Sequence, residues 1–375
     1  MNHLRKSTSD TTLALDSDAL LSNLKAYRNI LPAKHRIMAM LKANAYGLGV
    51  VPVAKILEEN HIDYFGVAYA DEGAELREAG ILSPIMVMNP GEKSIQMMLS
   101  LNLEPEIYSW GSLNRYLEAF EVHPKSLSKG RIHIKVDTGM NRLGFKVSDA
   151  YELTSRLSEL TGIIVVSVMS HLSSAESAVE DSFTKEQGVL FNSFCDIIEK
   201  GIQYRVIRHI ANTSATERFP NLYGGMVRLG IGLFGHSPVL NSKLKLSPVV
   251  FLNSSVTHIH DIGPGESVSY GRTFNTDSVK KIATISIGYA DGFPRILSNG
   301  IGQVVFKNQF FPVAGRVCMD MTMIDVTGSQ IKVGDQVEIF GKNISVEMFA
   351  KACETSTYEV LTRISPRLKR IKINL

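Results

Sequence analysis

The strongest constraint on the fold is an alternation of short β-branched segments with longer segments of helical period over the first two-thirds of the chain. Eight strands are expected, at 36–41, 64–69, 84–89, 105–109, 131–136, 162–169, 205–210 and within 226–234. Eight strands separated by helices over about 200 residues are typical of a (β/α)8 barrel of the TIM-like kind. A doubly wound open sheet shows the same alternation, so strand counting leaves both architectures open.

Capping residues predict where three helices begin. Asp16 or Ser17 would precede a helix over 18–30, Asp71 a helix over 72–79, and Asp181 or Ser182 a helix over 183–200.

The pattern changes near residue 240. Strand-like segments separated by Gly, Pro and Asn turns follow, at 251–259, 281–290, 302–317, 321–326 and 335–340, before a short helix at 346–354. We therefore predict three parts: an N-terminal segment 1–16, a barrel 17–240 and a mostly-β C-terminal domain 241–375. The early strand 11–16 is a candidate to pair with that domain.

Composition excludes several classes of protein. The chain of 375 residues has a formal charge of +3 without a basic block, which gives no reason to expect nucleic acid as a partner. We expect no membrane span and no signal peptide, because no long continuous apolar segment is present. Cys195, Cys318 and Cys353 form no zinc spacing or disulfide framework, so we expect a cytoplasmic protein without a metal.

Lys42 is the first candidate catalytic residue. It stands in MLKANAYGLG (40–49), directly after the first expected strand, which places it at the C-terminal mouth of a barrel. Apolar neighbours would remove part of its hydration and lower its pKa, giving an amine suited to a Schiff base. A solvated lysine at a strand end is the alternative interpretation.

A phosphate site is expected near the last two strands of such a barrel. There the segment 209–216 offers the hydroxyls of Thr213 and Ser214. Gly230 would let the backbone N–H groups of Gly230 and Ile231 approach a ligand closely. Arg228 lies in the same region, although a surface ion pair is its simplest alternative role.

The strand at 131–136 carries a candidate modification site. Its alternation puts His133, Lys135 and Asp137 on one face. A charged lysine inside a barrel is costly, so Lys135 could stay neutral and react with carbon dioxide to form a carbamate.

Together these motifs resemble those of the alanine racemases. Lys-Ala-Asn-Ala-Tyr-Gly-X-Gly at 42–49 is similar to the lysine motif that binds pyridoxal phosphate in that family, with Leu48 in place of the usual histidine. Further matches follow in the family's order, from about residue 11 to 370, at 132–145, 209–216, 224–232, 267–274, 287–295 and 315–321.

The resemblance implies an isomerase that uses pyridoxal 5'-phosphate to interconvert L-alanine and D-alanine by two-base proton transfer at Cα. Lys42 and Tyr270 would serve opposite faces of Cα. Arg228 would face the pyridine nitrogen. Arg142 would bind the substrate carboxylate, oriented by Lys135, which in some members of the family is carbamylated. The other implied positions are Tyr46, His171, Asn212, Thr213, Ser214, Gly230 and Ile231 at the cofactor, Met319 at the substrate, and His209, Tyr289 and Asp320 in support.

The same resemblance implies a homodimer with shared active sites, in which Tyr270, Tyr289, Met319 and Asp320 act on the other subunit's substrate. It also implies a role in supplying D-alanine for peptidoglycan.

Besides Leu48, two positions depart from the family pattern, and two other functions stay open. Pro366 stands where many members have a tyrosine that binds phosphate and narrows the entrance, and Glu176 stands where aspartate is common. The first alternative is another pyridoxal-phosphate enzyme, such as a decarboxylase or a racemase for serine or a basic amino acid, although Arg228 argues against a decarboxylase. The second is a non-catalytic pyridoxal-phosphate-binding protein, against which the extra β-rich domain argues.

Overall fold

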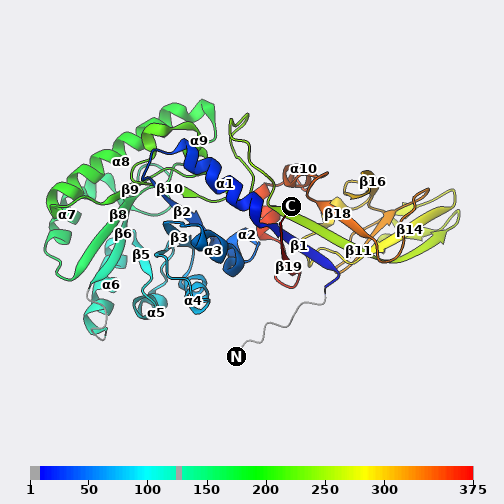
Figure 1. Ribbon diagram of the computed structural model, residues 1–375, viewed down its shortest axis with the longest axis horizontal. Helices are drawn as coiled ribbons and strands as arrows, with labels where there is room; N and C mark the ends of the chain where they lie inside the picture. The colour runs from blue at the N-terminus through cyan, green and yellow to red at the C-terminus, as the bar shows by residue number, and fades with distance from the viewer. Residues whose placement is uncertain (1–8, 124–128, 375) are drawn as a thin grey trace. The chain divides into compact units, whose positions relative to one another are not determined.

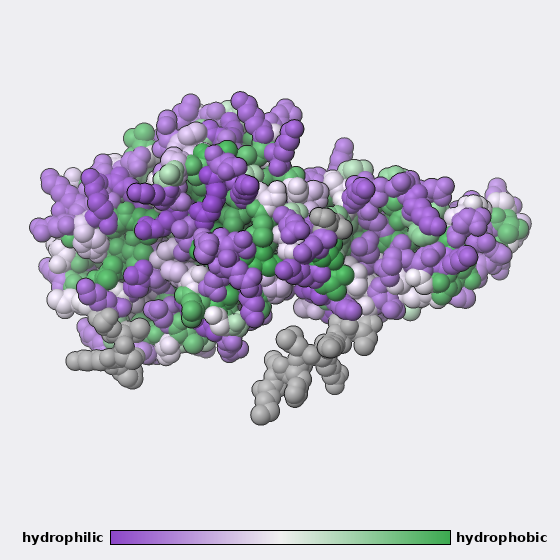
Figure 2. Space-filling model, viewed as in Figure 1, coloured by the Kyte–Doolittle hydropathy of each residue, from purple (hydrophilic) through white to green (hydrophobic). Residues whose placement is uncertain are grey.

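The computed structural model describes residues 9–123 and 129–374, so the first eight residues of the predicted segment 1–16 lie outside the described part. The chain divides into two compact units. The barrel unit consists of Leu21–Ala45 and Val50–Leu246. The β unit consists of Ser247–Leu375, Tyr46–Gly49 and the N-terminal residues through Leu20, as far as each is described. Hydrophilic residues cover much of the face of both units seen in Figure 2.

All eight expected barrel strands are present, and they form a parallel ring with the helices outside it (Figure 1). In chain order they are β2 (Arg36–Met40), β3 (Tyr64–Val67), β4 (Ile85–Val87), β5 (Glu104–Ile107), β6 (Gly130–Asp137), β8 (Ile163–Met169), β9 (Ile207–His209) and β10 (Met226–Leu229). The short β7 (Phe145–Lys146) pairs with β6.

The ring closes where the last strand meets the first. β10 pairs with β2 in parallel, with Arg228 opposite Met38. Two backbone hydrogen bonds connect the β9 region to the β10 region, from Gly225 to Arg208 (2.8 Å) and from Arg228 to Ala211 (3.0 Å). These contacts select the barrel over the open doubly wound sheet, which would leave both edge strands unpaired.

The helices of the barrel unit alternate with these strands. They are α3 (Val50–Glu59), α4 (Ala70–Glu78), α5 (Ile95–Ser100), α6 (Trp110–Val122), α7 (Ala150–Ser158), α8 (Asp181–Ile202) and α9 (Thr213–Arg218), while α1 (Ser17–Ile30) begins in the β unit. Because helices cover the outside and side chains fill the inside, the strands are buried almost throughout. No helix in the described ranges is long and apolar enough to cross a membrane.

Of the predicted helix starts, the one at α1 is confirmed and the one at α4 is wrong. The Asp16 carboxylate accepts hydrogen bonds from the N–H groups of Asp18 and Ala19, so Asp16 caps α1 as predicted. Asp71 is the wrong start for α4, which begins at Ala70. There the Glu72 carboxylate accepts the N–H groups of Ala68 and Tyr69.

The predicted start of α8 is also wrong. The helix begins at Asp181, and the Asp181 carboxylate forms an ion pair with Arg218 (2.6 Å) instead of capping the helix.

The β unit is built on a sheet in which the strand at 11–16 lies between two others. β1 (Thr11–Asp16) pairs antiparallel with β11 (Val250–Ile262) and parallel with β19 (Lys369–Ile373), which confirms the predicted pairing of this segment. The other members are β14 (Lys280–Ile285), β15 (Gln303–Phe306), β16 (Gln309–Pro312), β17 (Thr322–Asp325) and β18 (Gln336–Phe340), beside the small pair β12 (Ser267–Val268) and β13 (Phe274–Asn275).

Two short helices lie near the C-terminus of the β unit. The predicted helix appears as α10 (Val346–Ala352), and α11 (Thr357–Thr362) was not predicted.

Candidate functional site

Lys42 begins a left-handed turn at the end of β2. Ala43, Asn44 and Ala45 all have φ between 50° and 56°, a region that costs residues with a Cβ about 1 kcal/mol or more each. Two side chains hold the turn: the Glu72 carboxylate accepts the Ala43 N–H (2.6 Å), and the Asn44 side chain accepts the Val50 N–H (2.8 Å). Strain that the surroundings enforce in this way is typical of functional sites.

The Lys42 amine lies among other cations. Its side chain reaches solvent, but the protein packed around it still removes part of its hydration. This desolvation and the positive charges of Arg142, Arg228 and Lys135 lower the pKa of Lys42, while the Glu72 carboxylate opposes the shift. A lysine with a lowered pKa is the kind of amine that forms covalent adducts with carbonyl groups.

Arg228 is held rigidly inside the barrel. One terminal nitrogen donates to the His209 carbonyl (2.9 Å) and lies 3.0 Å from the His209 ring, and the other donates to the Ser170 carbonyl (2.8 Å). The second nitrogen also lies 3.2 Å from Nδ1 of His171. Burial lowers the pKa of Arg228 to about 10, so the guanidinium stays charged at neutral pH. Burial and Arg228 also lower the pKa values of both histidines, which are therefore neutral acceptors.

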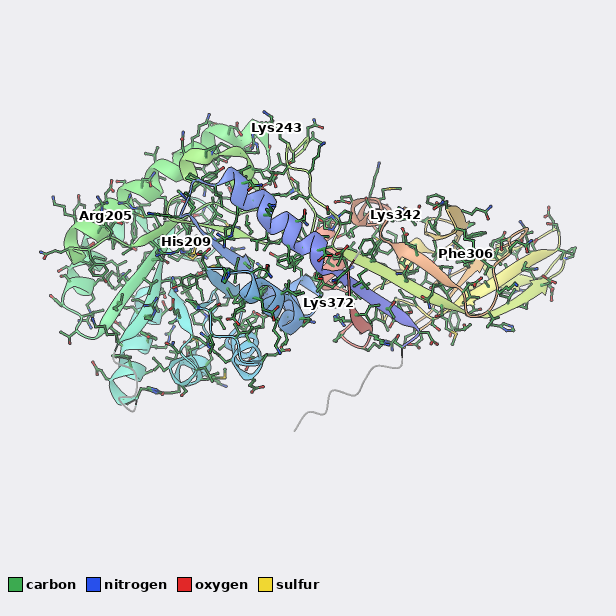
Figure 3. The ribbon with its side chains drawn as sticks, in the orientation of Figure 1. Arg205, His209, Lys243, Phe306, Lys342 and Lys372 are labelled. Carbon is green, nitrogen blue, oxygen red and sulfur yellow. The ribbon has the colours of Figure 1, made fainter. Side chains whose placement is uncertain are left out.

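A buried chain of hydrogen bonds continues from Arg228 through the barrel. His209, labelled in Figure 3, contacts Ser167 (2.8 Å), Ser167 contacts His133 (2.6 Å), and His133 contacts Glu104 (2.8 Å). Burial alone would raise the pKa of Glu104, but its hydrogen bonds from His133 and Arg131 lower it to about 2. Arg228, at one end of the chain, can only donate hydrogen bonds, and the Glu104 carboxylate, at the other end, can only accept them. Each group in between therefore donates its hydrogen bond to the next group in the direction of Glu104.

The expected phosphate segment lies between β9 and β10. Thr213 and Ser214 are buried at the start of α9, and the Gly230 N–H donates to the Thr213 hydroxyl (3.1 Å). The Asn212 side chain caps α9 by accepting the Ala215 N–H (3.0 Å). Ile231 is buried beside Gly230. The structure thus brings these predicted residues together, while their binding roles stay predictions.

Lys135 has a neighbour that sequence reasoning missed. Its ammonium lies 2.8 Å from a carboxylate oxygen of Glu106, which is fully buried on β5. Arg142 is exposed, and no ion pair or hydrogen bond engages its side chain in the described part of the chain. The signal was available in principle: Glu104 and Glu106 are two apart on one strand, as His133 and Lys135 are on the next.

Tyr46 and the glycine after it belong to the β unit. The Tyr46 ring lies 6.0 Å from that of Tyr358, a residue of α11 that sequence reasoning also missed. Burial, reinforced by Tyr358, raises the pKa of Tyr46, so its hydroxyl stays protonated. Gly47 has a φ of 85° and lies so close to the Leu361 carbonyl that a Cβ would clash with it. The Gly47 carbonyl accepts two hydrogen bonds from Arg370.

The other predicted residues of the β unit are exposed. Tyr270 is 68% exposed, and its hydroxyl makes no hydrogen bond to any described residue. Tyr289 and Met319 are also exposed, and the Tyr289 N–H donates to the Cys318 carbonyl beside Met319 (3.0 Å). Asp320 pairs with Arg367 (2.6 Å), the residue after Pro366.

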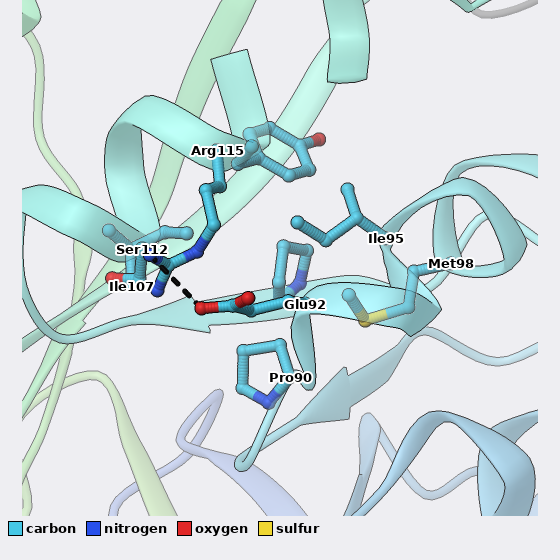
Figure 4. A pocket seen from close by; sticks show the side chains of 9 residues that line it. Pro90, Glu92, Ile95, Met98, Ile107, Ser112 and Arg115 are labelled. Atoms are coloured by element: carbon cyan, nitrogen blue, oxygen red, sulfur yellow. Dashed lines mark ion pairs between the residues drawn. The ribbon is translucent and has the colours of Figure 1, made fainter. Parts of the chain in front are cut away.

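Two surface hollows of the barrel unit are separate from these groups. The one in Figure 4 lies among η1 (Glu92–Ser94), α5 and α6, where Arg115 pairs with Glu92 (3.2 Å). Its volume of about 10 Å³ would hold about one water. The other, of about 430 Å³, lies at the end of α8 around Glu199 and Arg205. Neither hollow contains a predicted site residue, and the described residues include no cluster of acidic, histidine or cysteine side chains suited to a metal.

Comparison with known proteins gives consistent matches. Residues 15–238 match the family model described as "Alanine racemase, N-terminal domain", and residues 249–372 match "Alanine racemase, C-terminal domain". The alanine racemase of Methanococcus maripaludis is 39% identical, over 96% of this chain and 98% of that protein.

Solved structures agree with these matches. The alanine racemase of Clostridium difficile superposes with a TM-score of 0.92 at 34% identity, over 98% of this chain and 96% of that one. The alanine racemase of Bartonella henselae, described with covalently bound pyridoxal phosphate, has a TM-score of 0.86 at 29% identity, over 97% and 99% of the two chains.

Proposed function

The chain belongs to the alanine racemase family and has its isomerase activity on alanine, and we propose that Lys42 and Tyr270 are the two groups that move the proton at Cα. Lys42 would take or deliver the proton on one face, and Tyr270 on the other. Two acid/base groups on opposite faces are the simplest way to invert a carbon centre. This family membership sets aside the decarboxylase and the non-catalytic binding protein as alternatives.

The barrel residues fit pyridoxal 5'-phosphate as the cofactor. A lysine of lowered pKa lies near a buried, charged arginine and a segment with buried hydroxyls, and a structural neighbour carries this cofactor covalently. When bound, the cofactor supplies an electron-withdrawing ring that makes the proton on Cα easier to remove. Lys42 would hold it, while Tyr46, Thr213, Ser214, Gly230 and Ile231 would bind its phosphate, with Asn212 fixing the start of α9.

Arg228 is proposed to face the ring nitrogen of the cofactor. An arginine cannot practically give up its proton, so it donates a hydrogen bond without protonating that nitrogen. His171 and His209 would keep the guanidinium in place, because both are neutral acceptors within 3.2 Å of it. Arg142 would bind the substrate carboxylate, since its guanidinium has the fork that suits a carboxylate and is not engaged by the described residues.

Tyr270 is proposed to act on the active site of a second copy of the chain in a homodimer. The exposure of Tyr270, Tyr289 and Met319 supports this assignment, because exposed site residues need a partner to exclude water. Asp320, through its ion pair with Arg367, would stabilise the conformation of the same face. Met319 would line the pocket for the substrate. A cytoplasmic role in supplying D-alanine for peptidoglycan belongs to the same proposal.

The observation that carries the proposed mechanism is the pairing of Lys42, whose pKa is lowered by its surroundings, with a rigid, charged Arg228. The test is to incubate the purified enzyme and pyridoxal phosphate with single L-amino acids in deuterated water. We expect deuterium at Cα and formation of both enantiomers of alanine. Release of carbon dioxide, or deuterium exchange without inversion, would contradict the two-base mechanism.

A further inference from the structure

Glu106 and Lys135 form an isolated ion pair inside the barrel. They lie on the neighbouring strands β5 and β6, with Lys135 Nζ 2.8 Å from Glu106 Oε1. Glu106 is 0% exposed and Lys135 is 5% exposed, so water screens the pair very little. No described residue donates a hydrogen bond of normal geometry to either Glu106 oxygen. The positive charge of Lys135 is therefore what stabilises the buried Glu106 carboxylate.

The pair lies in a region where positive charge dominates. The charges of Arg142, Arg228 and Lys135 all act on Lys42, and the charge of Arg142 also acts on Arg228, which is itself buried. Burial raises the pKa of Glu106, and Lys135 and then Arg228 oppose that shift. The Lys135 ammonium and the Glu106 carboxylate together carry no net charge. Glu106 thus removes one cation from the group.

We propose that Glu106 neutralises Lys135, so that Lys135 stays unmodified and the site works without carbon dioxide. This inference rests on the proposed function, because it assigns Arg142 to the substrate carboxylate. With Lys135 already neutralised, Arg142 meets no like charge from it and remains available to an anionic substrate.

The chemistry of the modification explains why Glu106 opposes it. To form a carbamate, the lysine nitrogen attacks the carbon of carbon dioxide with its lone pair, and one N–H proton leaves for solvent. An ammonium paired with Glu106 has no lone pair to give. A carbamate formed there would add a second anion beside the Glu106 carboxylate in a buried region, where like charges repel strongly.

The first test is spectroscopic and uses the holoenzyme. The wild type, the variant E106Q and the double variant E106Q/K135Q are each equilibrated with ¹³C-labelled bicarbonate, and carbamate is read by ¹³C NMR. We expect no carbamate signal that depends on Lys135 in the wild type. We expect one in E106Q that disappears in the double variant. The single variant K135Q is measured in the same way. A wild-type signal that K135Q removes would overturn the inference, and this holds even if E106Q does not fold.

The second test is kinetic. In buffer depleted of carbon dioxide, E106Q should lose at least about tenfold in kcat/KM for alanine, mainly through KM, because the buried Lys135 charge has lost its partner in the group of cations that includes Arg142. Added bicarbonate should restore activity to E106Q and leave the wild type and E106Q/K135Q unchanged. E118Q, at an exposed glutamate of α6, is the matched control and should behave as wild type.

The outcomes separate the two proposals. A wild type that needs bicarbonate for activity would overturn the role of Glu106 while leaving the racemase intact. A wild type that does not racemise alanine under any condition would overturn the proposed function itself.

Discussion

The two units of the chain hold their candidate groups in opposite ways. In the barrel unit, Arg228 is 2% exposed and is held by carbonyls and neutral histidines within 3.2 Å. In the β unit, Tyr270 is 68% exposed and has no hydrogen-bond partner in the described chain. The barrel therefore holds Arg228 in place with its own residues, whereas the β unit presents Tyr270 without described partners that would fix its hydroxyl. Substitutions should separate activity from stability differently in the two units.

Removing the Lys42 amine should have the largest effect. K42A should lose at least about 10⁴-fold in racemase activity, because both the proposed anchor and one acid/base group disappear. The visible absorbance of bound cofactor should also be lost. The melting temperature of cofactor-free K42A should be close to that of the cofactor-free wild type, because the side chain reaches solvent. K55A, at an exposed lysine of α3, is the control. Retained activity in K42A would remove Lys42 from its role.

Tyr270 should separate activity from stability most cleanly. Y270F should lose about 10²- to 10⁴-fold in racemisation, the usual contribution of one acid/base group. The cofactor spectrum and the melting temperature should stay unchanged, since the hydroxyl makes no bond within the described chain. In deuterated water, one enantiomer of alanine should still exchange its Cα proton faster than the other. Equal losses in both directions of exchange would argue against a one-face role.

A substitution at Glu104, in the buried hydrogen-bond chain of the barrel, should lower stability, which Y270F should not do. The pKa of this carboxyl falls from 4.5 to about 2 on folding, which corresponds to about 3 kcal/mol of stability at neutral pH. This contribution is present above pH 4.5 and is lost as the pH falls toward 2. Urea unfolding of E104Q should therefore show the full deficit at pH 7 and a shrinking one below pH 4.5. A deficit that does not vary with pH would contradict the charge-based explanation.

The exposed ion pair of the β unit should have the smallest effect. Asp320 and Arg367 are both about half exposed, and such pairs contribute about 0–1 kcal/mol. D320N should therefore change the free energy of unfolding by less than about 1 kcal/mol. If D320N lowers activity without lowering stability, Asp320 positions the face that carries Tyr270, and unchanged activity would remove that role.

The sequence predicts the barrel well because its strands are buried. Eight β-branched segments and the pairing of 11–16 are confirmed, since burial on both faces leaves a strong pattern. The start of α8 was wrong because the Asp181 carboxylate pairs with Arg218, a tertiary contact that local spacing does not show. The start of α4 was wrong because Glu72, the residue after Asp71, is the one that caps the helix.

The candidate site is predicted only in part, for the same reason. The left-handed turn after Lys42 contains alanines and an asparagine, and Glu72 holds it from a distant part of the chain. Tyr358 and Glu106 were missed because each becomes notable only beside Tyr46 or Lys135 in space. Motif resemblance identified the residue types, but which groups neutralise one another follows from the fold.

The central claim is that Lys42 and Tyr270 of different copies form one active site, and mixing two inactive variants tests it most directly. K42A and Y270F are unfolded together, refolded as a mixture and assayed for alanine racemisation. Sites shared across a symmetric dimer predict that mixed dimers contain one intact site, so activity returns to about a quarter of the wild-type value. If both groups act within one copy, every site in the mixture carries a lesion, and no recovery of activity would contradict the account.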